Sequence, residues 1–329
     1  MSAGIVVIGR NEGDRLAGCL ESVAHLGYPV VYVDSGSIDR SVAIAASYGV
    51  ETIELDRSSP FSAARARNEG FRRLRDRQPG IEFVQFLDGD CILLPGWIDA
   101  AIRALSTQSK RAAVFGHLLE RNADATPYNR LCAMEWRRSA PGDLKDFGAL
   151  GGISIMRADV FSELGGFRPD VIAGEDSELG VRMGLAGYKI TKIDSPMASH
   201  DANMSSFRQW WRRAVRAGHA IGQRSDIHGR SALRDCVRER NSTLFWGIGF
   251  PLLVLLTAFP TRGASLLLLA AYPALGVRVW RHRRSLGERS GDAALYAAYV
   301  LIAKFAHAVG LTRFFISKLT QRYEIIEYK

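Results

Sequence analysis

The stretch Ile81-Glu82-Phe83-Val84-Gln85-Phe86-Leu87-Asp88-Gly89-Asp90 decides the fold of this 329-residue chain. Its mostly apolar first part predicts a buried β-strand that stops at Asp88. Two carboxylates then flank a glycine at the strand end. This arrangement suits a hard divalent cation, because Gly89 lets the backbone turn so that both carboxylates face the ion. An ordinary Asp-Gly turn after a buried strand is the alternative interpretation.

Strand-like and helix-like segments alternate upstream of this stretch. The predicted strands cover residues 4–9, 30–34 and 51–55, and the predicted helices cover residues 41–48 and 62–77. The alternation predicts an α/β fold with a mostly parallel sheet covered by helices. Ligands of such sheets bind beyond the carboxyl ends of the strands. Asn11, Asp34 and Asp88 fall at these ends.

A second pair of carboxylates, Glu175-Asp176, follows Gly174 and opens a short predicted helix. An acidic first turn is common in helices, and it explains one carboxylate without any chemistry. A partly buried carboxylate at this point could also take a proton from an attacking hydroxyl group. Both interpretations remain open from the residues alone.

Taken together, the motifs resemble the family 2 glycosyltransferases, whose fold is called GT-A. The resemblance covers roughly residues 4–220, and its elements come in the order of the family. They are the first strand with its Asn11-Glu12 turn, the loop Val33 to Asp39, Arg67-Asn68-Glu69-Gly70, Phe86 to Asp90, Gly151 to Ser154 with Phe161 to Phe167, and Gly174-Glu175-Asp176.

The resemblance implies a role for each matching residue. Asp88 and Asp90 would hold Mg²⁺ or Mn²⁺ on the donor diphosphate, and His200 matches a histidine that completes this site in some members. Contacts to the donor nucleotide would come from Glu12, Asp34, Arg67 and Asp88, and Glu175 would join the substrate-binding residues. Asp176 would be the general base of a single displacement that inverts the anomeric carbon.

The donor expected from the resemblance is a nucleotide sugar, most simply a UDP-sugar, and the acceptor a glycan or a lipid-linked glycan. The chain departs from the family's processive members, because Arg213 follows Gln209-Trp210-Trp211-Arg212 where those members carry tryptophan after arginine. This favours transfer of a single sugar over polymerisation. An amphipathic helix lying at a membrane surface is an alternative interpretation of residues 207–216.

The positive charge of the chain is concentrated in its last third. Residues 203–329 hold 20 of the 43 Lys and Arg residues but only 7 of the 34 Asp and Glu residues. A basic region of this kind suits nucleic acid or an anionic membrane surface. The sequence contains no nucleic-acid-binding motif, and the same region holds the longest apolar runs, which favours the membrane. The four cysteines form no C-x-x-C pair, which suits a reducing compartment and indicates neither a zinc site nor a disulfide framework.

Two uncharged runs predict a membrane hairpin at residues 242–280. The first lies between Arg240 and Arg262 and the second between Arg262 and Arg278. The outer flanks are rich in arginine, so both are expected in the cytoplasm. We therefore expect a glycosyltransferase domain at residues 1–225 facing the cytoplasm, and a helical region at residues 226–329 in the inner membrane. A further apolar stretch at residues 293–319 is expected to be interfacial or a packed helix.

Three functions compete at this point. The first is an inverting, metal-dependent glycosyltransferase of cell-surface polysaccharide synthesis. The second is a nucleotidyltransferase on a similar fold, although Gly9-Arg10-Asn11-Glu12 is not the glycine-rich phosphate loop expected of one. The third is a non-catalytic membrane scaffold, which predicts loss of the carboxylates that the chain retains.

Overall fold

The computed structural model describes residues 2–137 and 140–320, and contacts divide the chain into two compact units. The first unit comprises residues 1–121 and 135–202, and the second comprises residues 122–134 and 203–329. The first unit holds the β-sheet and the second is helical. The functional boundary expected at residue 225 falls inside helix α8 (Phe207–His228) and stays a prediction.

The first unit confirms the strand and helix pattern expected up to Asp88. Its strands are β1 (Ala3–Gly9), β2 (Val30–Asp34), β3 (Glu51–Glu54), β4 (Phe83–Asp88), β5 (Cys91–Leu93), β6 (Arg111–Glu120), β7 (Gly142–Asp143), β8 (Ser154–Arg157) and β9 (Lys189–His200). Its helices are α1 (Asp14–Ala24), α2 (Ser41–Ser47), α3 (Ala63–Arg77), α4 (Trp97–Ser106), α6 (Ala158–Glu163) and α7 (Glu175–Leu185), with a 3₁₀ turn η1 (Phe147–Ala149).

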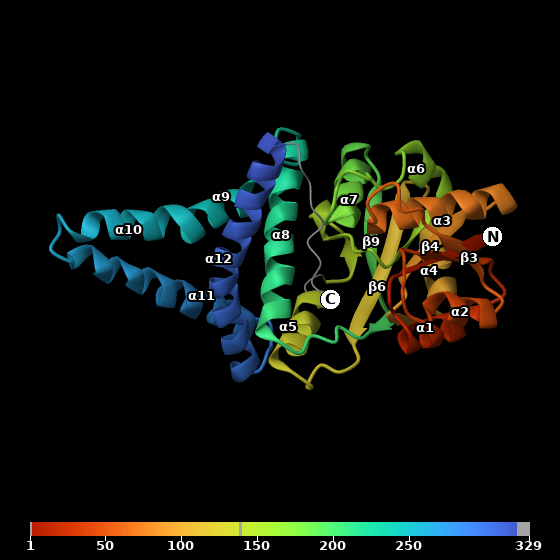
Figure 1. Ribbon diagram of the computed structural model, residues 1–329, viewed down its shortest axis with the longest axis horizontal. Helices are drawn as coiled ribbons and strands as arrows, with labels where there is room; N and C mark the ends of the chain where they lie inside the picture. The colour runs from red at the N-terminus through yellow and green to blue at the C-terminus, as the bar shows by residue number, and fades with distance from the viewer. Residues whose placement is uncertain (1, 138–139, 321–329) are drawn as a thin grey trace. The chain divides into compact units, whose positions relative to one another are not determined.

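The strands form one sheet in the order β3-β2-β1-β4-β8-β6-β9-β5, and β7 pairs with β9. Strands β3, β2, β1 and β4 are parallel, as the alternating pattern predicted. Beyond β4 the sheet is mixed, because β8 is antiparallel to β4 and β6, and β5 is antiparallel to β9. Helices α3 and α6 lie on one side of the sheet, and α1 and α2 lie on the other (Figure 1).

The register of the parallel strands brings their polar carboxyl ends together. Ile8 of β1 pairs with Asp88 of β4, and Gly9 pairs with Asp34 of β2. The central strand β1 is buried on both faces, which explains its continuous apolar sequence. The carboxyl ends of β1, β2 and β4 therefore lie side by side and form the predicted ligand-binding edge of the sheet.

Helix α3 lies unusually close to this row because of Gly70. A Cβ atom at this position would lie 2.4 Å from Cγ1 of Val6 in the neighbouring strand. Ser62 starts the helix by accepting a hydrogen bond from the backbone N–H of Arg65 at 3.1 Å. The close approach lets Arg67, one turn before Gly70, reach the carboxyl end of β4 from a buried position.

The second unit is built from helices. They are α5 (Pro127–Trp136), which ends in the first unit, α8, α9 (Val237–Leu244), the π-helical η2 (Phe245–Gly249), α10 (Phe250–Ala258), the 3₁₀ helix η3 (Ala264–Ala270), α11 (Ala271–Ser285) and α12 (Ser290–Thr320). Helix α8 begins with a capping box formed by Ser206 and Gln209.

Helices α8 and α12 pack backbone against backbone through glycines. A Cβ atom on Gly310 would lie 1.9 Å from the carbonyl oxygen of Val215, and one on Gly218 would lie 2.3 Å from that of His307. Small residues permit such an approach between helices in water and in lipid. Residues 293–319, which the sequence left as interfacial or packed, thus form a helix that packs along α8.

Helices α9, η2 and α10 form one run that turns back through residues 259–263 into η3 and α11, giving a helical hairpin (Figure 1). The hairpin exposes large apolar side chains, and Leu256 and Leu267 are 75% and 78% exposed. Two helical runs among the described residues, Val237–Ala258 and Ser290–Thr320, are long and apolar enough to cross a membrane.

Candidate active site

The Asp88-Gly89-Asp90 turn leaves β4 at the polar edge of the sheet. The backbone N–H of Gly89 donates a hydrogen bond of 2.8 Å to the carbonyl of Ile8, which holds the turn against β1. A Cβ atom on Gly89 would lie 3.2 Å from that carbonyl and 3.3 Å from Cγ of Glu12. Gly89 thus allows the turn to pack closely against the carboxyl end of β1, with Asp88 before it and Asp90 after it.

Arg67 joins the two carboxylate motifs of the sequence. Its Nη2 donates to Oδ1 of Asp88 at 2.7 Å, and its Nη1 donates to Oε1 of Glu175 at 2.6 Å. Burial alone lowers the pKa of the guanidinium, but Asp88, Glu175 and Asp176 raise the pKa above its usual value. Arg67 is therefore a permanent cation between the end of β4 and the start of α7. Gly152 leaves it room, because a Cβ atom there would lie 2.4 Å from Nη2.

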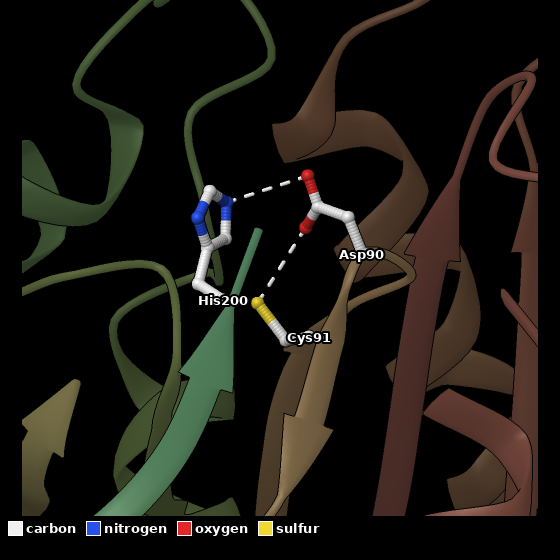
Figure 2. Close-up of side chains that lie close together, drawn as sticks. All are labelled: Asp90, Cys91 and His200. Atoms are coloured by element: carbon white, nitrogen blue, oxygen red, sulfur yellow. Dashed lines mark hydrogen bonds and ion pairs between the residues drawn. The ribbon is translucent and has the colours of Figure 1, made fainter. Parts of the chain in front are cut away.

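Asp90 faces a different partner from Asp88. Its Oδ2 lies 3.3 Å from Nε2 of His200, which comes from the end of β9 (Figure 2). The other ring nitrogen of His200, Nδ1, lies 3.8 Å from Oε2 of Glu120. Both carboxylates are buried, and the edge of the imidazole meets the ring of Trp136 at 4.7 Å. The histidine is therefore held between two acidic groups.

Cys91 is the third side chain of this cluster, as Figure 2 shows. Its thiol donates a weak hydrogen bond of 3.5 Å to Oδ1 of Asp90, and Cys91 pairs with His200 across the antiparallel strands β5 and β9. Burial raises the pKa of the thiol well above its ordinary value, and the charges of Asp90 and Asp88 raise it further. The thiol is therefore protonated at neutral pH in the absence of a cation.

The donor set at this turn fits a divalent cation. One carboxylate oxygen of Asp90, one nitrogen of His200 and the sulfur of Cys91 all lie within 4.8 Å of one another. Among the described residues, Asp88 is not part of this group, and its Oδ1 is instead bound to Arg67. Because the Asp88 side chain is 36% exposed, it still has an accessible face toward the open edge of the sheet.

The loop after β2 is fixed by Asp34. Its buried carboxylate accepts hydrogen bonds from the hydroxyl groups of Tyr32 at 2.9 Å and Ser37 at 2.5 Å, and from the backbone N–H of Ser37 at 2.7 Å. Burial and the Asp34 carboxylate raise the pKa of Tyr32, so the phenol stays protonated and donates. The expected nucleotide loop thus has one rigid conformation around its aspartate.

The loop after β1 is tied to the loop after β2. The backbone N–H of Asn11 donates to Oγ of Ser37 at 2.8 Å, and the side-chain oxygen of Asn11 accepts from the N–H of Ile38 at 2.8 Å. Asn11 has a φ of 55°, a left-handed conformation that asparagine tolerates better than most residues. Glu12 is buried beside it and forms an ion pair of 2.8 Å with Arg15.

The two carboxylates at the start of α7 have different surroundings. Glu175 is buried and bound to Arg67, whereas Asp176 is only half-buried and accepts a hydrogen bond of 2.7 Å from the N–H of Ser177. Gly174 precedes them with a φ of 74°, which a glycine adopts without strain. Asp176 thus lies close enough to Arg67 to affect its pKa, yet its side chain is reachable from solvent.

The structure thus brings the sequence-predicted residues together in two groups. Arg67, Asp88, Glu175 and Asp176 form one, and Asp90 and His200 form the other. The sequence analysis missed Cys91 and Glu120, which complete the second group. Cys91 stood next to the motif and could have been weighed as a ligand. No local pattern marks Glu120, because its place depends on the pairing of β6 with β9.

Comparisons with known proteins indicate the family and the fold. Residues 4–165 match the family model described as glycosyl transferase family 2. The chain is 28% identical over 193 residues to the O-antigen chain rhamnosyltransferase WbaN of Salmonella anatum, covering 56% of this chain and 59% of that protein. It is 26% identical over 206 residues to the glycosyltransferase AglE of Haloferax volcanii, covering 58% and 64%. The chain therefore spans about three fifths of the length of these relatives.

Solved structures show the same fold. The mannosyltransferase PcManGT of Pyrobaculum calidifontis, in complex with GDP-Man and Mn²⁺, superposes with a TM-score of 0.56 at 19% identity, covering 93% of this chain and 86% of that one. A fragment of TarS from S. aureus superposes with a TM-score of 0.55 at 15% identity, covering 100% and 95%. The fold is the GT-A fold that the sequence analysis expected.

Proposed function

Because residues 4–165 belong to glycosyl transferase family 2, we propose that this chain transfers a sugar from a nucleotide-sugar donor to a glycan or lipid-linked acceptor in the synthesis of a cell-surface polysaccharide. The proposal includes inversion at the anomeric carbon and dependence on Mg²⁺ or Mn²⁺. A UDP-sugar is the proposed donor, as the sequence analysis expected.

The observation that carries this proposal is the position of Arg67. Its buried guanidinium binds Asp88 at the end of β4 and Glu175 at the start of α7, and these two sites are 87 residues apart in the sequence. A structural ion pair would need only one of these carboxylates. An arginine held between the two brings the end of β4, where a diphosphate would bind, next to the start of α7, where a hydroxyl group would react.

The donor side of the proposed site consists of the three strand ends. Glu12 and Asp34 are proposed to contact the nucleoside, and Asp88 the ribose. Asp90 and His200 are proposed to hold the cation, together with Asp88 through its exposed face. When bound, a divalent cation offsets the negative charge that develops on the departing nucleoside diphosphate.

Asp176 is the proposed general base. Its side chain is half-buried and accepts a hydrogen bond of 2.7 Å from the backbone N–H of Ser177, whereas Glu175 binds Arg67 at 2.6 Å. The helix N-terminus favours the ionised carboxylate, which is the form that accepts a proton. In this proposal Asp176 takes the proton of the acceptor hydroxyl as its oxygen attacks the sugar carbon, and Glu175 keeps Arg67 in position.

A direct assay tests the proposed activity. The purified full-length protein, in detergent, is incubated with UDP- and GDP-linked hexoses, and release of nucleotide is measured with and without a chelator. We expect release that depends on a divalent cation and falls strongly in Asp90→Asn. Glu163→Gln changes a carboxylate outside the site and serves as the matched control. Turnover that persists in chelator would contradict the metal-dependent mechanism.

The hairpin supports a further part of the proposal, namely that the chain is held in the inner membrane with its N-terminal domain in the cytoplasm. Of the 21 uncharged residues between Arg240 and Arg262, those up to Ala258 are helical and extend about 27 Å, close to the thickness of a bilayer core. The 15 residues between Arg262 and Arg278 are fewer, but seven of them form the 3₁₀ helix η3, which rises about 2.0 Å per residue. The second leg thereby reaches about 26 Å.

The polar groups of the hairpin also suit lipid. Four residues between Phe245 and Trp280 carry a hydroxyl group, and each hydroxyl donates to a backbone carbonyl of the hairpin. They are Thr257, Thr261, Ser265 and Tyr272, bound to the carbonyls of Leu253, Thr257, Val254 and Trp246. Polar groups without water must find such internal partners, so the hairpin carries its polar side chains into lipid at little cost.

Charge substitutions test the membrane proposal. Leu252→Arg and Leu269→Arg place a charge near the middle of the two legs, and Leu286→Arg places one on an exposed leucine outside them. We expect the first two variants to shift from the carbonate-washed membrane fraction to the supernatant or to be degraded, and the third to stay with the membrane. Wild-type protein that is released completely by carbonate would overturn the proposal.

A further inference from the structure

The cation site proposed above contains a sulfur atom that the proposed reaction does not use. Asp90, Cys91 and His200 present an oxygen, a sulfur and a nitrogen to one point. Mg²⁺ takes oxygen ligands, whereas thiolate and imidazole ligands suit zinc and related ions. The sulfur and nitrogen donors therefore indicate an ion of the zinc type, which the two aspartates alone would not indicate.

We propose that Cys91 is a metal ligand and that Asp90, Cys91 and His200 form a tetrahedral site selective for Zn²⁺ over Mg²⁺ and Mn²⁺. This inference rests on the proposed cation site and adds to it the chemical class of ion that binds most tightly. On binding, the ion replaces the proton of the Cys91 thiol, and this proton passes to solvent.

The distances support a tetrahedral ion. Zinc binds nitrogen and oxygen at about 2.0–2.2 Å and sulfur at about 2.3 Å, so ligand atoms in a tetrahedron lie about 3.3–3.7 Å apart. Nε2 of His200 lies 3.3 Å from Oδ2 of Asp90, and Sγ of Cys91 lies 3.5 Å from Oδ1 of Asp90. The two contacts involve different oxygens of Asp90, so the side chains must rotate to bring one oxygen, Nε2 and Sγ to a single ion; one ligand atom from each of the three residues already lies within 4.8 Å of the others. The fourth position stays open for Asp88, a donor phosphate or water.

The strand pairing fixes two of these ligands. Cys91 on β5 lies directly opposite His200 on β9 in an antiparallel pair, and opposite residues direct their side chains to the same face. The pairing of β5 with β9 thus keeps the side chains of Cys91 and His200 on the same face of the sheet.

Glu120 lies behind the other ring nitrogen of His200. Its Oε2 is 3.8 Å from Nδ1, which is too long for a hydrogen bond, and it accepts a hydrogen bond of 3.1 Å from the backbone N–H of Ala202. In the metal-bound state we expect Nδ1 to donate to this carboxylate, as metal-bound histidines usually do. This leaves Nε2, the atom that faces Asp90, for the ion.

Co²⁺ serves as a spectroscopic probe of the full-length protein freed of metal. A thiolate ligand gives an intense near-ultraviolet charge-transfer band, and Zn²⁺ should abolish this band by displacement. We expect the band in wild-type protein and its loss in Cys91→Ser. Cys19→Ser is the matched control, because Cys19 is also a buried thiol near the motif but binds the carbonyl of Asp88.

The decisive comparison is between ions, because sites without sulfur also prefer Zn²⁺ to Mn²⁺. Cys91→Ser should weaken Zn²⁺ binding at least about tenfold and change Mn²⁺ binding less than about threefold, since Mn²⁺ gains little from sulfur. Glu120→Gln should weaken Zn²⁺ binding about 10- to 100-fold. These affinities are measured by competition with a chromophoric chelator, so they do not depend on catalysis.

Two results would overturn the inference. One is Co²⁺ binding to wild-type protein without the charge-transfer band, a measurement that needs no variant to fold. The other is an equal loss of Zn²⁺ and Mn²⁺ affinity in Cys91→Ser. The proposed cation site itself fails separately, if Asp90→Asn binds Mn²⁺ as tightly as the wild type does.

Discussion

Replacing the Arg67 side chain by an uncharged one leaves the carboxylates of Asp88 and Glu175 without their shared cation. The burial of each carboxylate determines how much the free energy of unfolding should fall. In Arg67→Met the Glu175 carboxylate, 8% exposed, loses a charged hydrogen bond of 2.6 Å. Breaking one partner out of a buried ion pair costs about 3–5 kcal/mol. The Asp88 carboxylate is 36% exposed, so water takes over part of its solvation and its share is smaller.

We therefore expect Arg67→Met to lower the free energy of unfolding by about 3–5 kcal/mol. A domain of 150–250 residues loses about 2–4 °C in Tm per kcal/mol, so the expected shift is about 6–20 °C. Thermal and urea unfolding of the full-length protein, followed by circular dichroism, measure both quantities. Arg65→Met is the matched control on the same helix. Its partner Asp56 is largely exposed, so the expected loss is much smaller.

The double variant separates this explanation from a loss of packing. Glu175→Gln removes the buried charge, so in Arg67→Met/Glu175→Gln no uncompensated carboxylate remains at this position. We expect the two changes to be non-additive, with a coupling free energy of about 1–3 kcal/mol. Additive losses, or an Arg67→Met variant within about 1 kcal/mol of the wild type, would refute the reasoning.

The other predictions concern catalysis, packing and pH. Asp176→Asn should reduce turnover about 10²- to 10⁴-fold with donor binding intact, and Glu175→Gln should be milder; the reverse order would make the neighbour the base. Gly310→Ala should destabilise the protein by about 1–3 kcal/mol in thermal unfolding, whereas Gly291→Ala, whose Cβ would meet open space, should not. Burial, aided by a neighbouring arginine, lowers the pKa of His219 to about 4. The unfolded chain therefore binds the extra proton first, and stability should fall as the pH drops from about 6.5 to 4, by on the order of 3 kcal/mol. A His219→Phe variant should show a flatter pH profile.

The sequence was sufficient for the parts of the fold that local patterns specify. Apolar runs located β1, β2 and β4, and the rule for strand ends correctly brought Asp34 and Asp88 to one edge of the sheet. The antiparallel pairing of β8 and β5 could not be foreseen, because each strand is only three or four residues long and pairs with strands far away in the chain. Pairing of this kind depends on tertiary packing and leaves no periodic signal.

In the site, too, local motifs were predictable from the sequence and contacts between distant segments were not. The sequence expected both aspartates of the turn at one ion, because they flank a glycine. In the structure Asp88 is bound to Arg67 and Asp90 faces His200, while joint ligation stays a prediction. Glu120 and Cys91 came to light only through the pairing of β9 with β6 and β5. Sequence motifs thus identify side chains that can bind an ion. The pairing of the strands determines which of these side chains lie close together.

The ties between the first two loops bear on the kinetics of donor capture. Asn11 joins the loop after β1 to Ser37 and Ile38 of the loop after β2, and its left-handed backbone is maintained by the folded protein alone. Ordering a mobile loop on association costs free energy and slows productive encounters. Here the two loops are already joined, so we expect the proposed nucleotide site to bind without first ordering them. Loosening the tie with Asn11→Ala should therefore appear as a less favourable binding entropy and a slower association rate, with the rate of sugar transfer from the bound donor unchanged.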